Sequence, residues 1–134
     1  MNNSEKRKFY AKKYAEFATN IDMLSLADKL NQVPGEKSYW ANILSETEQE
    51  IKVLEQKKKY IIKTLQKKLI DNSEIKLNKS TLDKIEESQD VEELNQEIED
   101  LKLNFKQLER IYDCVKYIAK DFENIIKFIQ LQEG

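Results

Sequence analysis

Glycine and proline are scarce in this chain of 134 residues, which contains two glycines and one proline. Between Gly35 and Gly134 neither residue occurs, so no strong helix breaker interrupts that stretch. A β-sheet protein needs many more turn residues than this. The scarcity therefore predicts an all-α fold, which we expect to form a single domain over residues 1–134.

Histidine is absent and Cys114 is the only cysteine. The usual zinc ligands and the usual base of nucleophilic catalysis are therefore missing, and one cysteine cannot form an internal disulfide. The sequence also lacks a glycine-rich phosphate loop, a run of about eighteen apolar residues and an N-terminal signal segment. We expect no enzyme, no metal or other cofactor and no membrane partner, and we expect the protein to work in the cytoplasm.

The net charge of −2 conceals a segregation of charge along the sequence. Between Lys52 and Lys68 seven lysines face a single acid, Glu55. From Asp83 to Asp100 nine acids face a single base, Lys84. The folded molecule should therefore carry a positive zone and a negative zone.

Apolar residues at alternating steps of three and four predict two long helices, over residues 36–70 and 90–132, that pair as an antiparallel, coiled-coil-like hairpin. In the first helix the seam contains Thr47, Lys58 and Lys68. These polar positions predict that the pairing is partly wet or opens toward the C-terminal end of that helix. The seam of the second helix is unbroken and consists of Val91, Leu94, Ile98, Leu101, Phe105, Leu108, Tyr112, Val115, Ala119, Phe122, Ile126 and Ile129.

The remaining segments predict shorter elements. Residues 1–35 are expected to form an N-terminal arm of two helices, a basic one near residues 4–19 and a second one that ends at Pro34 and Gly35. The basic helix is expected to pack on its own protein rather than on a membrane, and to be available to polyanions. Residues 71–89 are expected to hold a loop and one short helix.

The last helix carries more apolar surface than one partner uses. A row at steps of seven, Ile111, Ile118 and Ile125, lies directly beside the seam, and a two-stranded pairing does not require it. We therefore predict that this part of the helix contacts other copies of the chain. The predicted interface consists of Ile111, Tyr112, Val115, Ile118, Phe122, Ile125, Ile126 and Ile129.

The lysines of the helix at 36–70 allow two interpretations. They form a track for the backbone of a polyanion, with Tyr60 available to stack on a base. Alternatively they form an ordinary solvated helix face whose charge is balanced by the acids of the next helix. The candidate nucleic-acid-binding residues are Lys57, Lys58, Lys59, Tyr60, Lys63, Lys67 and Lys68.

From Ile21 to Gln66 the sequence resembles, without a gap, the UvsY recombination mediators of T-even phages. The DNA-binding signature of that family, Lys-Ala-Arg-Leu, falls on residues 63–66, and only Lys63 is retained. Loss of the arginine removes a planar donor for phosphates and bases, so contact with DNA must depend on the lysines. The matching positions are Ile21, Asp22, Leu26, Ser38, Trp40, Asn42, Ser45, Glu50, Glu55, Lys58, Lys59 and Lys63.

The resemblance implies a protein that binds single-stranded DNA and helps a RecA-like recombinase to displace the single-strand-binding protein, in the cytoplasm of a phage-infected cell. It also implies a ring-shaped homo-oligomer closed by the C-terminal helices. One subunit that holds about four phosphates binds weakly at cellular salt, whereas many linked copies gain avidity of roughly 10² to 10⁴. The acidic stretch at 83–100 is then free to contact a basic partner.

A second function class stays open. A structural, scaffolding coiled coil that binds only protein partners explains both apolar seams equally well and gives the lysines no role. Titration of a labelled oligonucleotide separates the two classes, because only the first predicts binding that weakens with salt.

Overall fold

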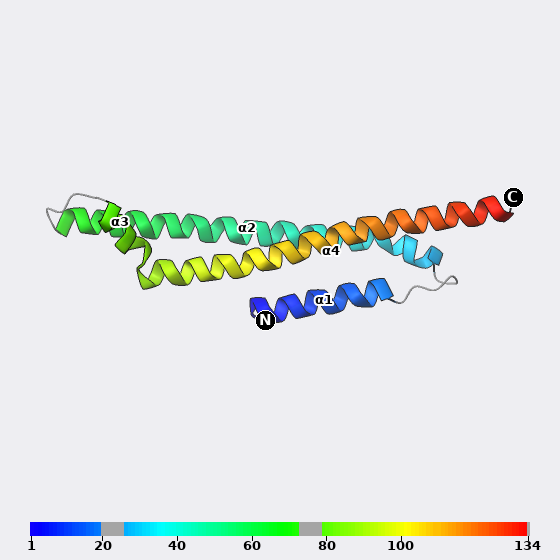
Figure 1. The fold of residues 1–134 in the computed structure, drawn as a ribbon, viewed down its shortest axis with the longest axis horizontal. Coiled ribbons are helices and arrows are strands. Elements are labelled where there is room, and N and C mark those ends of the chain that lie inside the picture. The colour runs from blue at the N-terminus through cyan, green and yellow to red at the C-terminus, as the bar shows by residue number, and fades with distance from the viewer. Residues whose placement is uncertain (20–25, 73–78, 134) are drawn as a thin grey trace. The chain divides into compact units, whose positions relative to one another are not determined.

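A computed structural model describes residues 1–19, 26–72 and 79–133. Its elements are α1 (Asn3–Thr19), α2 (Leu26–Asn72), α3 (Lys79–Glu86) and α4 (Gln89–Glu133), shown in Figure 1. The described residues contain no strand, and the two longest helices are α2 and α4. The predictions of an all-α fold and of a pair of long helices are confirmed.

The chain divides into two compact units. Unit 1 comprises Met1–Glu46 and Asn104–Gly134, and unit 2 comprises Thr47–Leu103. Helices α2 and α4 contribute to both units, whereas α1 belongs to unit 1 and α3 to unit 2. Within each unit α2 and α4 run in opposite directions, as the sequence predicts (Figure 1).

The core of unit 1 is centred on Trp40, whose side chain is fully buried. Its ring meets the ring of Tyr10 edge to face at a centroid distance of 6.0 Å, and that of Tyr39 at 5.1 Å. Its Nε1 atom donates a hydrogen bond of 3.0 Å to the carboxylate of Glu36. The other buried members of this core are Phe17, Leu26, Val33, Leu108, Ile111, Val115, Ala119 and Phe122.

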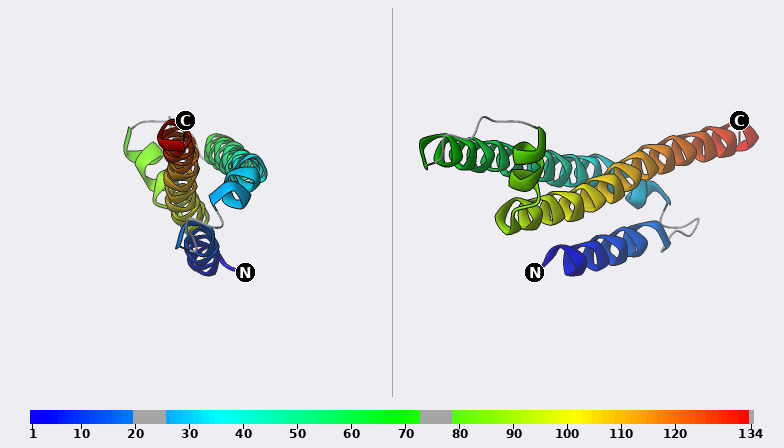
Figure 2. Two further views of the ribbon diagram at one scale, coloured as in Figure 1. Left: turned by 90° about the vertical axis from the view of Figure 1, so that its right-hand side faces the viewer. Right: turned by 60° about the vertical axis from the view of Figure 1, so that its left-hand side comes forward.

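Helix α1 packs on its own chain, as predicted, and buries Tyr10 and Phe17. A guanidinium nitrogen of Arg7 donates a hydrogen bond of 2.8 Å to Oδ1 of Asn104, which is almost completely buried. The side-chain amide of Gln107 donates another, also 2.8 Å, to the main-chain oxygen of Arg7. Figure 2 shows α1 running alongside α4. In unit 1, α4 therefore has two partner helices from the same chain.

Tyr14 on α1 lies against Cys114 on α4. Burial raises the pKa of the Tyr14 hydroxyl to about 12, and the neighbouring Cys114 adds to that shift through repulsion between its thiolate and the phenolate and through its side-chain hydrogen bond with Tyr14. The packed position of α1 therefore favours the neutral phenol over its anion.

One sequence prediction about α2 is wrong. The sequence predicts a helix end at Pro34 and Gly35, but α2 is continuous through both. Pro34 removes one main-chain hydrogen bond, but Leu26, Val33 and Trp40 recur at steps of seven across it and all three are buried. Burial of these side chains outweighs the local cost, because each is worth about 1.5 to 3 kcal/mol.

Replacing Gly35 with alanine should therefore stabilise the protein. A Cβ atom added at this position meets no other atom within 4 Å, and no glycine in the described residues has a positive φ. We expect the free energy of unfolding in urea to rise by about 0.5 to 1 kcal/mol, because alanine loses less backbone entropy in a helix. Gln32→Ala, an exposed control in the same helix, should change it by a few tenths. A destabilised Gly35→Ala variant would contradict a continuous helix.

Unit 2 contains the rest of the hairpin and α3, which lies within residues 71–89, where a short helix is predicted. Burial falls along α2: Ile51 is buried, Leu65 is half-buried and Lys68 is exposed. This confirms that the pairing of α2 with α4 becomes more solvent-exposed toward the C-terminal end of α2. The predicted loop falls partly on residues 73–78, which lie outside the described residues. Among the residues of unit 2 whose burial the structure describes, the buried side chains are Thr47, Ile51, Ile85, Val91, Leu94, Ile98 and Leu101.

Candidate nucleic-acid interface

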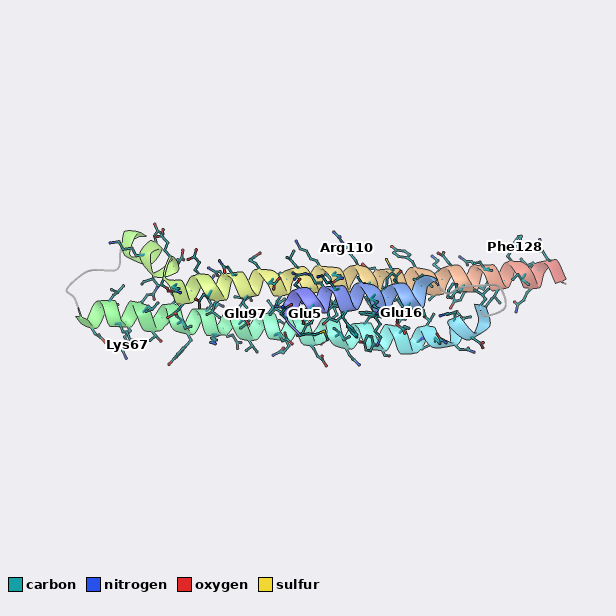
Figure 3. All side chains as sticks on the ribbon, turned by 90° about the horizontal axis from the view of Figure 1, so that it is seen from below. Glu5, Glu16, Lys67, Glu97, Arg110 and Phe128 are labelled. Carbon is teal, nitrogen blue, oxygen red and sulfur yellow. The ribbon has the colours of Figure 1, made fainter. Side chains whose placement is uncertain are left out.

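The outer side of α2 in unit 2 carries lysines one turn apart. Lys59, Lys63 and Lys67 follow one another at steps of four, which places them on one side of the helix with a rise of about 6 Å per step. All three are exposed, and Tyr60 between them is 72% exposed. Figure 3 shows Lys67 on the side of α2 that faces away from α4. We call these four residues the lysine face.

Acids stand at both ends of this row at the same step of four, because Glu55 precedes Lys59 and the exposed Asp71 follows Lys67. A carboxylate oxygen of Glu55 lies 3.9 Å from Nζ of Lys102 on α4, and Glu55 is half-buried. Lys102 also pairs with Glu99, at 3.8 Å. Earlier in α2, Lys52 pairs with Glu48 at 3.6 Å. In the part of the chain that the structure describes, no ion pair involves a lysine of the lysine face.

The structure separates the other predicted lysines from this face. Lys58 is half-buried at its seam position, and Lys68 is exposed near the end of α2. Lys57 lies at a hollow of about 230 Å³ between α2 and α4. Acids of α4 therefore lie near Lys57, but among the described residues no ion pair within 4.0 Å joins them to it. The hollow is lined by Lys57 and Ile61 of α2 and by Asp90, Glu93, Leu94 and Glu97 of α4.

The residues of the predicted subunit interface on α4 differ in how far they are buried within the chain. Part of the extra apolar row is covered by the same chain, because Ile111 belongs to the core that Tyr10 and Phe17 of α1 complete. Ile125 is 40% exposed, and beyond it Phe128 (labelled in Figure 3) is 61% exposed. Contact with other copies therefore stays a prediction for the exposed end of α4. Of the other predicted residues, Val115 and Phe122 are buried, and Tyr112, Ile118, Ile126 and Ile129 are half-buried.

Sequence reasoning missed the polar contacts that hold these helices together. The width of the apolar stripe on α4 indicated a further partner, and the core that α1 completes includes one residue of that stripe, Ile111. The pairing of Glu55 with Lys102 depends on the alignment of two helices far apart in the sequence. The pattern of residues within either helix does not predict that alignment.

Comparison with known proteins does not assign the chain to a family. No family model, curated protein or solved structure matches the chain. Among the described residues, no group of three or more histidine, cysteine, aspartate or glutamate side chains is placed to hold a metal ion. None of the described helices combines the length and the apolar character that crossing a membrane requires.

Proposed function

We propose that the protein is a recombination mediator that binds single-stranded DNA through the lysine face of α2. The observation that carries this proposal is the exposed row of Lys59, Lys63 and Lys67, none of which forms an ion pair among the described residues, while Glu55, four residues before the row, pairs with Lys102 of α4. A row of unpaired cations on a helix attracts a polyanion at cellular ionic strength.

Single strands fit this face better than duplexes. Lysines contact phosphates without reading sequence, and the exposed ring of Tyr60 provides a surface on which an unpaired base stacks. In a duplex the bases are already stacked on one another, so Tyr60 adds nothing there. Arginine is absent from the lysine face, so we expect little base preference.

The partners follow from the resemblance to the UvsY family. They are a RecA-like recombinase, a single-strand-binding protein and further copies of the chain in a ring. Self-association through the exposed end of α4 would raise the affinity by avidity, because a single lysine face holds only a few phosphates. The exposed acids of α4, including Glu92 and Glu93, are available to a basic protein partner.

The scaffolding alternative is supported by the seams, since buried apolar residues account for both long helices without any ligand. It gives the exposed row of lysines no role. The two proposals differ in whether the purified protein binds a nucleic acid at all.

Titration of labelled oligo(dT) at about 50 and about 200 mM salt tests the proposal. A lysine face that contacts about three phosphates predicts a logarithmic salt slope of roughly −2, and hence binding about 20-fold weaker at the higher salt. A duplex of the same length should bind more weakly than the single strand. Absence of binding at both salt concentrations would favour the scaffold.

A further inference from the structure

We propose that Asp90, Glu93 and Glu97 of α4 hold Lys57 out of the nucleic-acid interface and so limit the affinity of the lysine face. This inference rests on the proposed function, because it assigns a restraint to the same site. It also reverses the sequence prediction that Lys57 contacts DNA.

The hollow between α2 and α4 carries an excess of negative charge. Three carboxylates and one ammonium group line it, and all four side chains are exposed. Its other two lining residues, Ile61 and Leu94, are apolar and do not neutralise charge. The side chains that line the hollow therefore sum to a net charge of about −2, and their repulsion of a phosphate acts within the Debye length of about 8 to 10 Å.

Lys57 has no fixed counterion in this hollow. Among the described residues no ion pair within 4.0 Å joins it to an acid. Its ammonium group is therefore free to move toward a phosphate once the repulsion is removed. The acids act at a distance, through the field that they create at the edge of α2.

The position of these acids beside α2 gives them this role. Two residues correspond to about 200° of rotation around a helix, so Lys57 points well away from Lys59. It lies on the flank of α2 that lines the hollow with α4. A strand that spreads from the lysine face toward α4 reaches the acids of the hollow first. The acids therefore confine the strand to the outer side of α2 and keep its affinity moderate, which a protein that passes its strand to another protein requires.

The test is a double-mutant cycle on the full chain, measured by anisotropy of labelled oligo(dT) over a range of salt concentrations. Glu93→Gln with Glu97→Gln should tighten binding about fivefold at low salt, as expected for two charges removed near the strand. The salt slope should steepen by about 0.7, which corresponds to one more phosphate contact. Lys57→Ala should have little effect in the native chain but should reverse the gain in the double variant.

The matched control is Glu92→Gln with Glu99→Gln, which removes the same charge from α4 at a different hollow. It should alter affinity less than twofold. The inference would be overturned if the control pair tightened oligo(dT) binding equally, or if Glu93→Gln with Glu97→Gln left the affinity unchanged. It would also be overturned if Lys57→Ala weakened binding as much as Lys63→Ala does. If the native chain binds no oligo(dT), the proposed function fails, and this inference fails with it. Circular dichroism of each variant checks that it is folded.

Discussion

Replacing Lys59, Lys63 and Lys67 together with alanine is expected to weaken oligo(dT) binding about 100-fold at about 100 mM salt. Each exposed lysine that meets a phosphate is worth about 1 kcal/mol, and about 1.4 kcal/mol corresponds to tenfold in affinity. The logarithmic salt slope should become shallower by about 2, since three phosphate contacts are lost. Fluorescence anisotropy over a salt series measures both quantities.

The matched control for this triple variant removes three exposed lysines elsewhere. Lys84 lies on α3, and Lys106 and Lys120 lie on α4. Replacing these with alanine changes the net charge equally and should alter the affinity less than threefold if position on α2 is what matters. Equal losses in the two triple variants would mean that binding depends on net charge alone, and the lysine face would then have no special role.

Trp40→Ala is expected to lower the free energy of unfolding by about 3 to 5 kcal/mol, as for other fully buried aromatic residues. The ring is completely buried, contacts Tyr10 and Tyr39, and donates a hydrogen bond to Glu36. Its removal leaves a cavity where α1 meets α2 in unit 1. Because the chain has no other tryptophan, urea unfolding should be followed by far-ultraviolet circular dichroism rather than by fluorescence.

Tyr60→Ala, on the same helix as Trp40→Ala, should affect DNA binding rather than stability. Its side chain is 72% exposed, so its removal should change stability by no more than about 0.5 kcal/mol. The same variant should weaken oligo(dT) binding, because base stacking on an aromatic ring is worth about 1 to 3 kcal/mol. A loss of less than about 1 kcal/mol in Trp40→Ala would contradict a core built on that ring.

Most of the fold could be predicted from spacing alone. Twelve apolar residues at steps of three and four defined the register of α4, and each of them is buried or half-buried. The error at Pro34 came from giving a local breaker more weight than a period that continues in register through Val33 and Trp40. Burial over a long helix outweighs one missing main-chain hydrogen bond.

The candidate site was predictable in part, for a physical reason. The four-residue steps of Lys59, Lys63 and Lys67 fix their common side of the helix before any contact is known. Whether Lys57 joins them depends on which residues of α4 lie opposite, and that alignment is a property of two packed helices. The cover that α1 gives to Ile111 is likewise a tertiary contact that helix periodicity does not report.

Chemical acetylation of the native chain, with and without bound oligo(dT), shows which lysines the strand covers. Mass spectrometry reads the extent of modification at each lysine. We expect Lys59, Lys63 and Lys67 to become protected while Lys57 and Lys106 stay reactive. Protection confined to other lysines, or none under conditions where the oligonucleotide is bound, would contradict this expectation.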